Sequence, residues 1–227
     1  MLVLVDLDGT LIPLESWDPV FYEVAASVAS RIGIEPGDFW GLVKAFHYQL
    51  MRRLSPRAFD WQYLIESVAA SFGIYEVPRI EDVLNKYVAG FSLYDGALDL
   101  LKGIRDMGLE AAIATNGLYQ YQYIVIKALG LEKYIKEIRT SDRYGCIKSC
   151  KEFFDGGVAM IGDNPVFDVY FPQRYGLKTI FVGSWADKAQ KYGELLGVDL
   201  SSTRPDYAVR DLREALRALK ETLDLIY

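Results

Sequence analysis

Acidic side chains follow two apolar runs of the chain. The first run ends at Asp6 and Asp8, and a later one is followed by Asp163 and Asp168. Asp8-Gly9 is a strong hairpin signal, but the residues after it lack the alternating pattern of a return strand. Because like carboxylates repel, their repeated clustering favours a site whose chemistry requires them.

Other polar residues stand after further apolar runs. Thr115 and Asn116 follow one run, and Lys148 comes shortly after another. In an open parallel sheet, ligands bind outside the carboxyl ends of the strands, so all of these groups are expected at one edge. Several carboxylates gathered with one lysine and a hydroxyl at this edge need a cation to compensate their negative charge. Oxygen ligands of this kind suit Mg²⁺, which binds one or two carboxylates plus substrate phosphate.

Apolar, β-rich runs that could position these groups alternate with helical segments. This alternation predicts an α/β fold, a Rossmann-like parallel sheet with helices on both faces. The predicted strands are residues 2–6, 109–115, 136–140, 158–162, 178–182 and 207–209.

A long stretch between the first two predicted strands has helical punctuation instead. Asp18 and Ser55 each precede a proline, the pattern of a helix start, and Gly33 and Gly73 stand where those helices would end. We therefore expect an all-helical domain inserted into the sheet domain. The predicted organisation is an α/β core of residues 1–14 and 91–227 and an inserted helical domain of residues 15–90.

Composition limits the classes of function. The 227 residues are 51% hydrophobic and carry a formal net charge of −6, so nucleic acid and anionic membranes are not expected partners. No apolar run approaches the roughly 20 residues of a membrane span. The N-terminal run lacks a basic region and ends at Asp6, so we expect no signal peptide and a cytoplasmic protein.

The two cysteines, Cys146 and Cys150, lie four residues apart. With His47 as the only histidine, they cannot complete a four-ligand zinc site. A disulfide is conceivable, but in a reducing compartment we expect reduced, structural thiols.

Four motifs stand in a fixed order: DLDGT, ATNG, the lysine after SDRYG, and GDNPVFD. Together they resemble the motifs of the haloacid dehalogenase superfamily, and the helical insertion resembles the cap of its phosphoglycolate-phosphatase-like branch. Two features depart from the family. Ser149 replaces the usual proline and nine residues separate Lys148 from the next strand, so the helix there must be short and Lys151 becomes a rival lysine. Pro172 should break the helix after GDNPVFD.

The resemblance implies a role for each charged residue. Asp6 resembles the nucleophile that forms an aspartyl-phosphate, and Asp8 resembles the general acid and base. Lys148 would neutralise charge between the phosphate and Asp6. The Mg²⁺ ligands implied are Asp6, the backbone carbonyl of Asp8, and Asp163, with Asp168 supporting them.

The uncharged motif residues receive supporting roles. Thr115 and the backbone amide of Asn116 would hold the phosphoryl oxygens, together with Lys148. Gly9 would permit the backbone turn, and Thr10 would buttress Asp6.

The resemblance thus predicts a Mg²⁺-dependent phosphatase of a small phosphorylated metabolite, as a monomer or homodimer. A phosphomutase and a catalytically silent binding or regulatory protein remain alternatives, whereas Asp8 argues against a dehalogenase. Candidate substrate contacts in the inserted domain are weaker, because aromatics at helical spacing are usually core and an arginine pair is usually solvated. These candidates are Trp17, Phe21, His47, Arg52 and Arg53.

Overall fold

The protein is built on one parallel sheet. In the computed structural model, which describes residues 1–224, the strand order is β3-β2-β1-β4-β5-β6 and every pairing is parallel. The six strands differ from the predicted runs by at most one residue at either end, which confirms the predicted fold class. Their bounds are Leu2–Val5 (β1), Glu110–Ala114 (β2), Glu137–Arg139 (β3), Gly157–Gly162 (β4), Lys178–Val182 (β5) and Tyr207–Val209 (β6).

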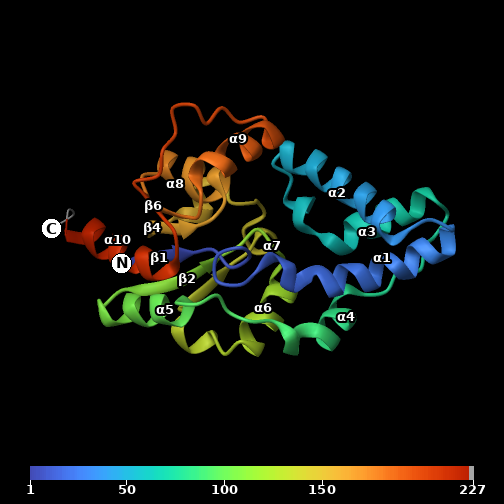
Figure 1. Ribbon diagram of the computed structural model, residues 1–227, viewed down its shortest axis with the longest axis horizontal. Coiled ribbons are helices and arrows are strands. Elements are labelled where there is room, and N and C mark those ends of the chain that lie inside the picture. Colours follow the sequence, from blue (N-terminus) through green and yellow to red (C-terminus); the bar gives the residue numbers. More distant parts are fainter. Residues whose placement is uncertain (225–227) are drawn as a thin grey trace.

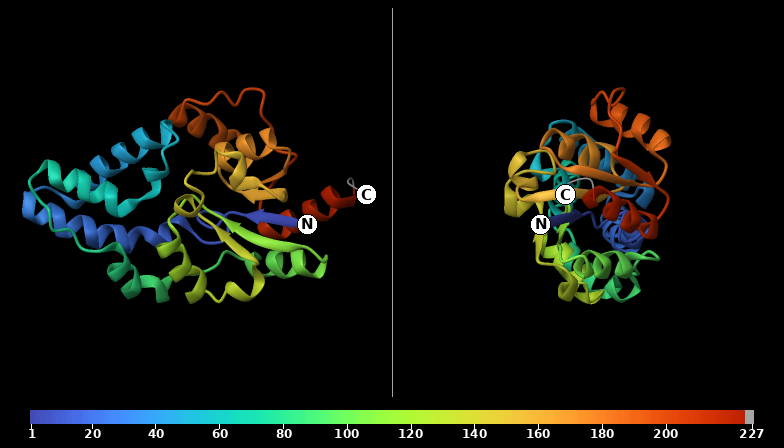
Figure 2. Two further views of the ribbon diagram at one scale, coloured as in Figure 1. Left: turned by 180° about the vertical axis from the view of Figure 1, so that it is seen from behind. Right: turned by 90° about the vertical axis from the view of Figure 1, so that its left-hand side faces the viewer.

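Both faces of the sheet are buried. Alternate side chains of β1 point to opposite faces: Val3 and Val5 join one apolar cluster, and Leu2 and Leu4 join the other. The first cluster includes residues of α5, α6 and α10, and the second includes residues of α8 and α9 (Figures 1 and 2). The covering helices are Ala97–Asp106 (α5), Tyr119–Ala128 (α6), Phe171–Arg174 (α8), Trp185–Leu196 (α9) and Leu212–Asp224 (α10).

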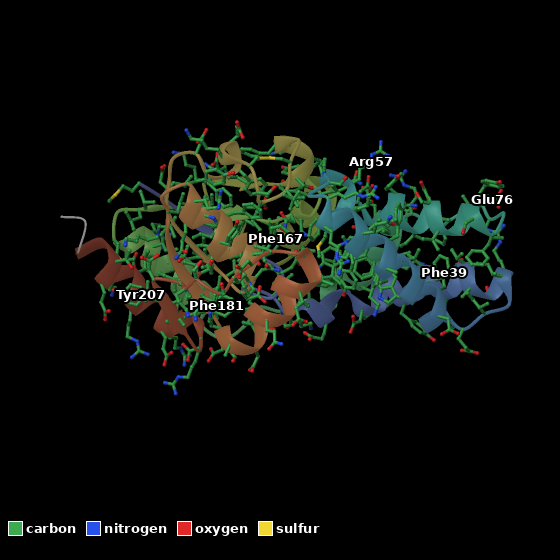
Figure 3. The ribbon with its side chains drawn as sticks, turned by 90° about the horizontal axis from the view of Figure 1, so that it is seen from above. Phe39, Arg57, Glu76, Phe167, Phe181 and Tyr207 are labelled. Atoms are coloured by element: carbon green, nitrogen blue, oxygen red, sulfur yellow. A yellow bond between two sulfur atoms is a disulfide. The ribbon has the colours of Figure 1, made fainter. Side chains whose placement is uncertain are left out.

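Residues 14–90, which lie between β1 and α5, form helices that gather at the end of the molecule opposite the two termini (Figure 1). Phe39 and Glu76 lie in this part, Phe181 and Tyr207 lie in the sheet part, and Phe167 lies between them (Figure 3). The bounds are Asp18–Ile32 (α1), Pro36–Arg52 (α2), Trp61–Ser71 (α3) and Ile80–Tyr87 (α4), with 3₁₀ turns Leu14–Trp17 (η1), Pro56–Phe59 (η2) and Val88–Gly90 (η3).

The predicted helix starts in this part are only partly right. Asp18 does not cap α1, because η1 leads directly into the helix and Asp18 already has helical backbone angles. Ser55 accepts a hydrogen bond from the backbone N–H of Arg57, but it caps only η2, and Asp60 caps α3. Gly33 ends α1 with a left-handed backbone (φ +80°), as predicted.

The segments around β3 and β4 are short, which confirms the predicted short helix after Lys148. A break at Pro172 is also present, since a π-helix gives way to α8 there with the proline in the first turn. These elements are Glu132–Tyr134 (η4), Ser141–Tyr144 (α7), Lys151–Phe154 (η5) and the π-helix Pro165–Tyr170 (η6). No helix among residues 1–224 has the length and apolar character needed to cross a membrane.

Candidate active site

The two aspartates of the first motif directly follow the central strand. Strand β1 delivers Asp6 to the carboxyl edge of the sheet, and a tight loop from Leu7 to Ile12 turns the chain, with the Gly9 N–H donating to the Ile12 carbonyl at 2.8 Å. Gly9 has φ +89°, and a Cβ there would lie 2.8 Å from both carboxylate oxygens of Asp163. Glycine is therefore required by both the backbone and the neighbouring side chain.

The other two aspartates follow strand β4 at the same edge, Asp163 directly after the strand and Asp168 in the π-helix η6. Asp168 is fully buried and accepts the backbone N–H of Asn164 at 2.8 Å, which closes the loop before the π-helix. Asp163 accepts from Lys188 Nζ of α9 at 2.6 Å. Thr10 Oγ1 lies 3.2 Å from an oxygen of Asp6 and 3.2 Å from an oxygen of Asp163. Its single proton serves one of the two carboxylates at a time.

Lys148 is buried between two of these carboxylates. Its Nζ donates to Asp6 Oδ1 and to Asp168 Oδ1, each at 2.6 Å, and its backbone N–H donates to Asn116 Oδ1 at 2.7 Å. Burial alone would lower the pKa of Lys148, but the charges of Asp168 and Asp6 raise it above its ordinary value, so the side chain is an ammonium. The rival Lys151 is exposed on η5 and makes no ion pair within residues 1–224.

Asp8 has separate partners from those of Asp6. Trp17 Nε1 donates to Asp8 Oδ1 at 2.7 Å, Gln122 Nε2 donates to Oδ2 at 2.8 Å, and the Thr115 hydroxyl lies 3.4 Å from Oδ2. Burial raises the pKa of the Asp8 carboxyl, and the donors Trp17 and Gln122 offset part of this rise. A carboxyl group with a raised pKa is suited to giving and taking protons near neutral pH.

Negative charge exceeds positive charge at this edge of the sheet. Four carboxylates (Asp6, Asp8, Asp163 and Asp168) meet two lysines (Lys148 and Lys188), which leaves two negative charges unbalanced. Burial raises the pKa of Asp6 well above its ordinary value, and although Lys148 lowers it, the charges of Asp168 and Asp163 raise it further. A divalent cation would supply the missing positive charge.

Three side chains are close enough to share such an ion. Ligand atoms of Asp6, Asp163 and Asp168 all lie within 4.8 Å of one another, and all three residues are buried. All-oxygen carboxylate ligands fit a hard divalent metal. This group includes Asp168, for which the sequence predicted only a supporting role. It does not include the side chain of Asp8, which was predicted to contribute its backbone carbonyl instead.

A cavity of about 370 Å³ opens beside the carboxylates. Thr115 and Asn116 line it next to Asp6, Asp8 and Lys148, so the structure brings these predicted residues together. Its opposite side is formed by the inserted helices. The residues there are Leu14, Trp17, Asp18, Phe21, Trp40, Lys44, His47, Tyr48, Met51, Phe59 and Trp61.

The weaker candidates of the inserted segment separate into two groups. Trp17, Phe21 and His47 line the cavity, so core packing alone does not describe them. Arg52 and Arg53 do not line it. Arg52 instead donates from Nε to the Leu195 carbonyl of α9 at 2.6 Å, and Arg53 is exposed.

Two polar side chains that donate hydrogen bonds to the aspartates were missed in the sequence. Gln122 lies in an aromatic stretch of α6 and is buried. A polar residue on the inward face of a helix is the feature of the sequence that could have identified it. Lys188 gave no signal, because a lysine in a partly exposed helix such as α9 is ordinary.

Cys146 and Cys150, which flank Lys148 in sequence, are joined by a disulfide, contrary to the expected free thiols. The loop that carries Lys148 turns tightly after α7 and brings the two Cα atoms to 6.3 Å, within the range that a disulfide spans. The loop bearing the buried lysine is therefore closed covalently.

The strand order of the parallel sheet reverses beside β1, and four aspartates and a buried lysine lie at its carboxyl edge, which is where doubly wound α/β proteins bind their ligands. Residues 1–176 match the model of the haloacid dehalogenase-like hydrolase family, and residues 148–215 match a second model of HAD-like hydrolases. The chain belongs to the haloacid dehalogenase-like hydrolase family.

Individual relatives agree with this assignment. The chain is 30% identical over 141 residues to the HAD-hydrolase YfnB of Bacillus subtilis, a match that covers 57% of this chain and 55% of that protein. It is 25% identical to the glyceraldehyde 3-phosphate phosphatase of Methanocaldococcus jannaschii, with 96% of each chain covered. The crystal structure of a HAD phosphatase from Thermococcus onnurineus has the same fold, with a TM-score of 0.74, 23% identity and 96% of each chain covered.

Proposed function

We propose that this protein is a Mg²⁺-dependent phosphatase that hydrolyses a small phosphorylated metabolite through an aspartyl-phosphate on Asp6. The observation that carries the proposal is the division of partners between the first two aspartates. Asp6 lies against the ammonium of Lys148, whereas Asp8 faces the same cavity with its own set of donors. The full-length similarity to a named phosphatase supports the reaction type.

In the first step, a carboxylate oxygen of Asp6 attacks phosphorus and the bond between phosphorus and the ester oxygen breaks. Asp8 gives its proton to that departing oxygen. In the second step, water attacks the phosphorus of the aspartyl-phosphate while Asp8 takes one of its protons. The bond between phosphorus and Asp6 then breaks, which releases inorganic phosphate and restores both carboxyl groups.

Positive charge is needed to keep Asp6 ionised, because burial and its acidic neighbours raise its pKa. Lys148 supplies one charge by direct contact. The side chains of Asp6 and Asp163 and the backbone carbonyl of Asp8 would hold Mg²⁺, with Asp168 as a supporting group. When bound, the ion would neutralise phosphoryl charge and orient the phosphate.

Thr115 and the backbone amide of Asn116 would bind the phosphoryl oxygens beside Lys148. Asn116 also accepts the Lys148 backbone N–H, so it links the loops after β2 and β3. We further propose that residues 15–90 act as a cap domain over residues 1–14 and 91–227. The contact between α2 and α9 through Arg52 supports closure of the two over the cavity.

The test is phosphate release from a panel of phosphorylated metabolites, measured with Mg²⁺, with EDTA, and after Mg²⁺ is returned. The proposal predicts activity only with the metal, and no turnover by Asp6→Asn in a preparation with unchanged circular dichroism. Conversion of a sugar phosphate into its isomer without phosphate release would identify a mutase. Binding of phosphorylated compounds without either reaction would identify a silent protein.

A further inference from the structure

Aromatic rings cover the side of the cavity that faces the carboxylates. Phe21 stacks on Trp40 with ring centroids 4.8 Å apart, and Trp61 lies 5.0 Å from Phe21 and 5.3 Å from Trp40. Each of these three rings is only half-buried, and each lines the cavity. We call this set, together with Trp17 and Phe59, the aromatic wall.

The aromatic wall begins at the proposed general acid. Trp17 donates its indole N–H to Asp8, and its ring stacks on Phe21 at 5.7 Å. Phe21 in turn contacts Trp40 and Trp61. The oxygen that leaves phosphorus must reach Asp8 to be protonated, so the group attached to that oxygen extends along these rings.

The imidazole of His47, which also lines the cavity beside the aromatic wall, is uncharged. The imidazole of His47 lies tilted against Trp61, with ring centroids 4.6 Å apart, and edge-on to Phe59 at 5.1 Å. Burial lowers the pKa of His47 to about 4, and its Nδ1 contacts the Ala58 carbonyl, so Nδ1 carries the proton of a neutral ring. His47 therefore adds no charge beside Trp61 and Phe59, and the charged side chains that line this side of the cavity are Asp18 on α1 and Lys44 on α2.

These contacts point to the chemical class of the leaving group. A chain of hydroxyls placed against ring faces would lose hydrogen bonds to water without replacing all of them, and each loss weakens binding. A planar, largely apolar ring would bury area against the wall and gain stacking contacts. The volume of about 370 Å³ accommodates a group of this size beside the phosphate.

We propose that the protein prefers phosphomonoesters whose alcohol carries a planar, largely apolar ring. This inference rests on the phosphatase function proposed above. It separates this chain from its relative in Methanocaldococcus jannaschii, whose name specifies the small, polar substrate glyceraldehyde 3-phosphate.

The experiment compares substrates that expel the same kind of oxygen. 2-Phenylethyl phosphate, n-propyl phosphate and glyceraldehyde 3-phosphate all release a primary alkoxide, so the comparison reports binding of the leaving group and not its intrinsic reactivity. Burial and stacking of one ring predict a kcat/KM for the phenylethyl ester that is about 10- to 100-fold above that of the propyl ester. The ratio of these two values is the readout.

Variants assign the preference to the aromatic wall. Trp40→Leu and Trp61→Leu, made separately, should each reduce the ratio about 3- to 10-fold, with folding checked by circular dichroism. Tyr22→Leu is the matched control, because Tyr22 neighbours Phe21 on α1 but is 66% exposed and lies outside the cavity. It should leave the ratio unchanged.

The outcomes distinguish the two levels of the proposal. Hydrolysis of the propyl ester or glyceraldehyde 3-phosphate with no preference for the ring overturns the inference and leaves the phosphatase function standing. An unchanged ratio of the two kcat/KM values in both Trp40→Leu and Trp61→Leu also overturns the inference, because the aromatic wall is then not the source of the preference for the ring. Failure to release phosphate from any of the three esters in the presence of Mg²⁺ overturns the inference and the proposed function together.

Discussion

Replacing Lys148 by methionine removes one positive charge from between two buried carboxylates while keeping an unbranched side chain of similar length. The Nζ atom lies 2.6 Å from Asp6 and 2.6 Å from Asp168, and all three side chains are at least nine-tenths buried. Removal of one partner from a buried ion pair costs about 3–5 kcal/mol, because the remaining charge stays desolvated. We expect a loss of this size at pH 8 without metal.

The loss should depend on pH in a defined direction. Burial already raises the pKa of Asp6 and of Asp168 above 3.8, and loss of Lys148 raises both further. The folded protein then holds protons that the unfolded chain has released, so its stability falls as pH rises above about 4. Lys148 titrates far above this range, so it contributes no slope of its own. Lys148→Met should therefore be closest to wild type at pH 5 and furthest from it at pH 8.

Urea unfolding followed by circular dichroism at pH 5, 6.5 and 8 measures this difference, and added Mg²⁺ should reduce it by supplying charge near Asp6. Lys151→Met is the matched control, because Lys151 is exposed and should change the free energy of unfolding by less than about 0.5 kcal/mol. Equal stability of the two variants at pH 8 would refute the assignment of Lys148 as the buried counter-charge.

Substitutions of Gly9 and His47, with Gly33→Ala as a control, test the loop and the inserted helices. Gly9→Ala should abolish turnover and lower the free energy of unfolding by about 1–3 kcal/mol, because its Cβ would meet the Asp163 carboxylate. Gly33 has a similar positive φ but open space around it, so Gly33→Ala should keep its activity. Wild-type activity in Gly9→Ala would contradict this. From pH 6.5 to 4, wild type should lose about 2.5 kcal/mol relative to His47→Asn, because His47 binds a proton more weakly in the folded protein than in the unfolded chain. If the free energies of unfolding of wild type and His47→Asn change equally between pH 6.5 and 4, His47 is not a buried neutral imidazole.

The sheet could be predicted from the sequence because its strands are buried on both faces. Such strands appear as continuous apolar runs, as LVLV does at the N-terminus, and the polar residue after each run marks its carboxyl end. The position of Asp6 and Asp163 at one edge follows from parallel pairing alone. Helix starts were less predictable, since Asp18 precedes a proline yet lies within α1 after an unpredicted 3₁₀ turn.

Contacts set by the packing of distant elements could not be predicted. Lys188 reaches Asp163 because α9 packs against η6, the π-helix that follows β4, and nothing in its local sequence distinguishes it from a surface lysine. Helical spacing placed Phe21 on an apolar face of its helix. Whether its ring is fully buried or lines a cavity depends on the distance between α1 and the helices α2 and α3. The disulfide likewise depends on how the loop around Lys148 folds.

The most direct test of the central claim uses Asp8→Asn with p-nitrophenyl phosphate and Mg²⁺. This substrate leaves without protonation, so Asp6 should still be phosphorylated, whereas hydrolysis should slow by about 10²–10⁴-fold without the base. The variant should release a burst of about one nitrophenol per active site, and borohydride reduction followed by mass spectrometry should find homoserine at position 6. A modification at any other residue, or steady turnover at the wild-type rate without a burst, would contradict the assignment of Asp6 as nucleophile and Asp8 as acid and base.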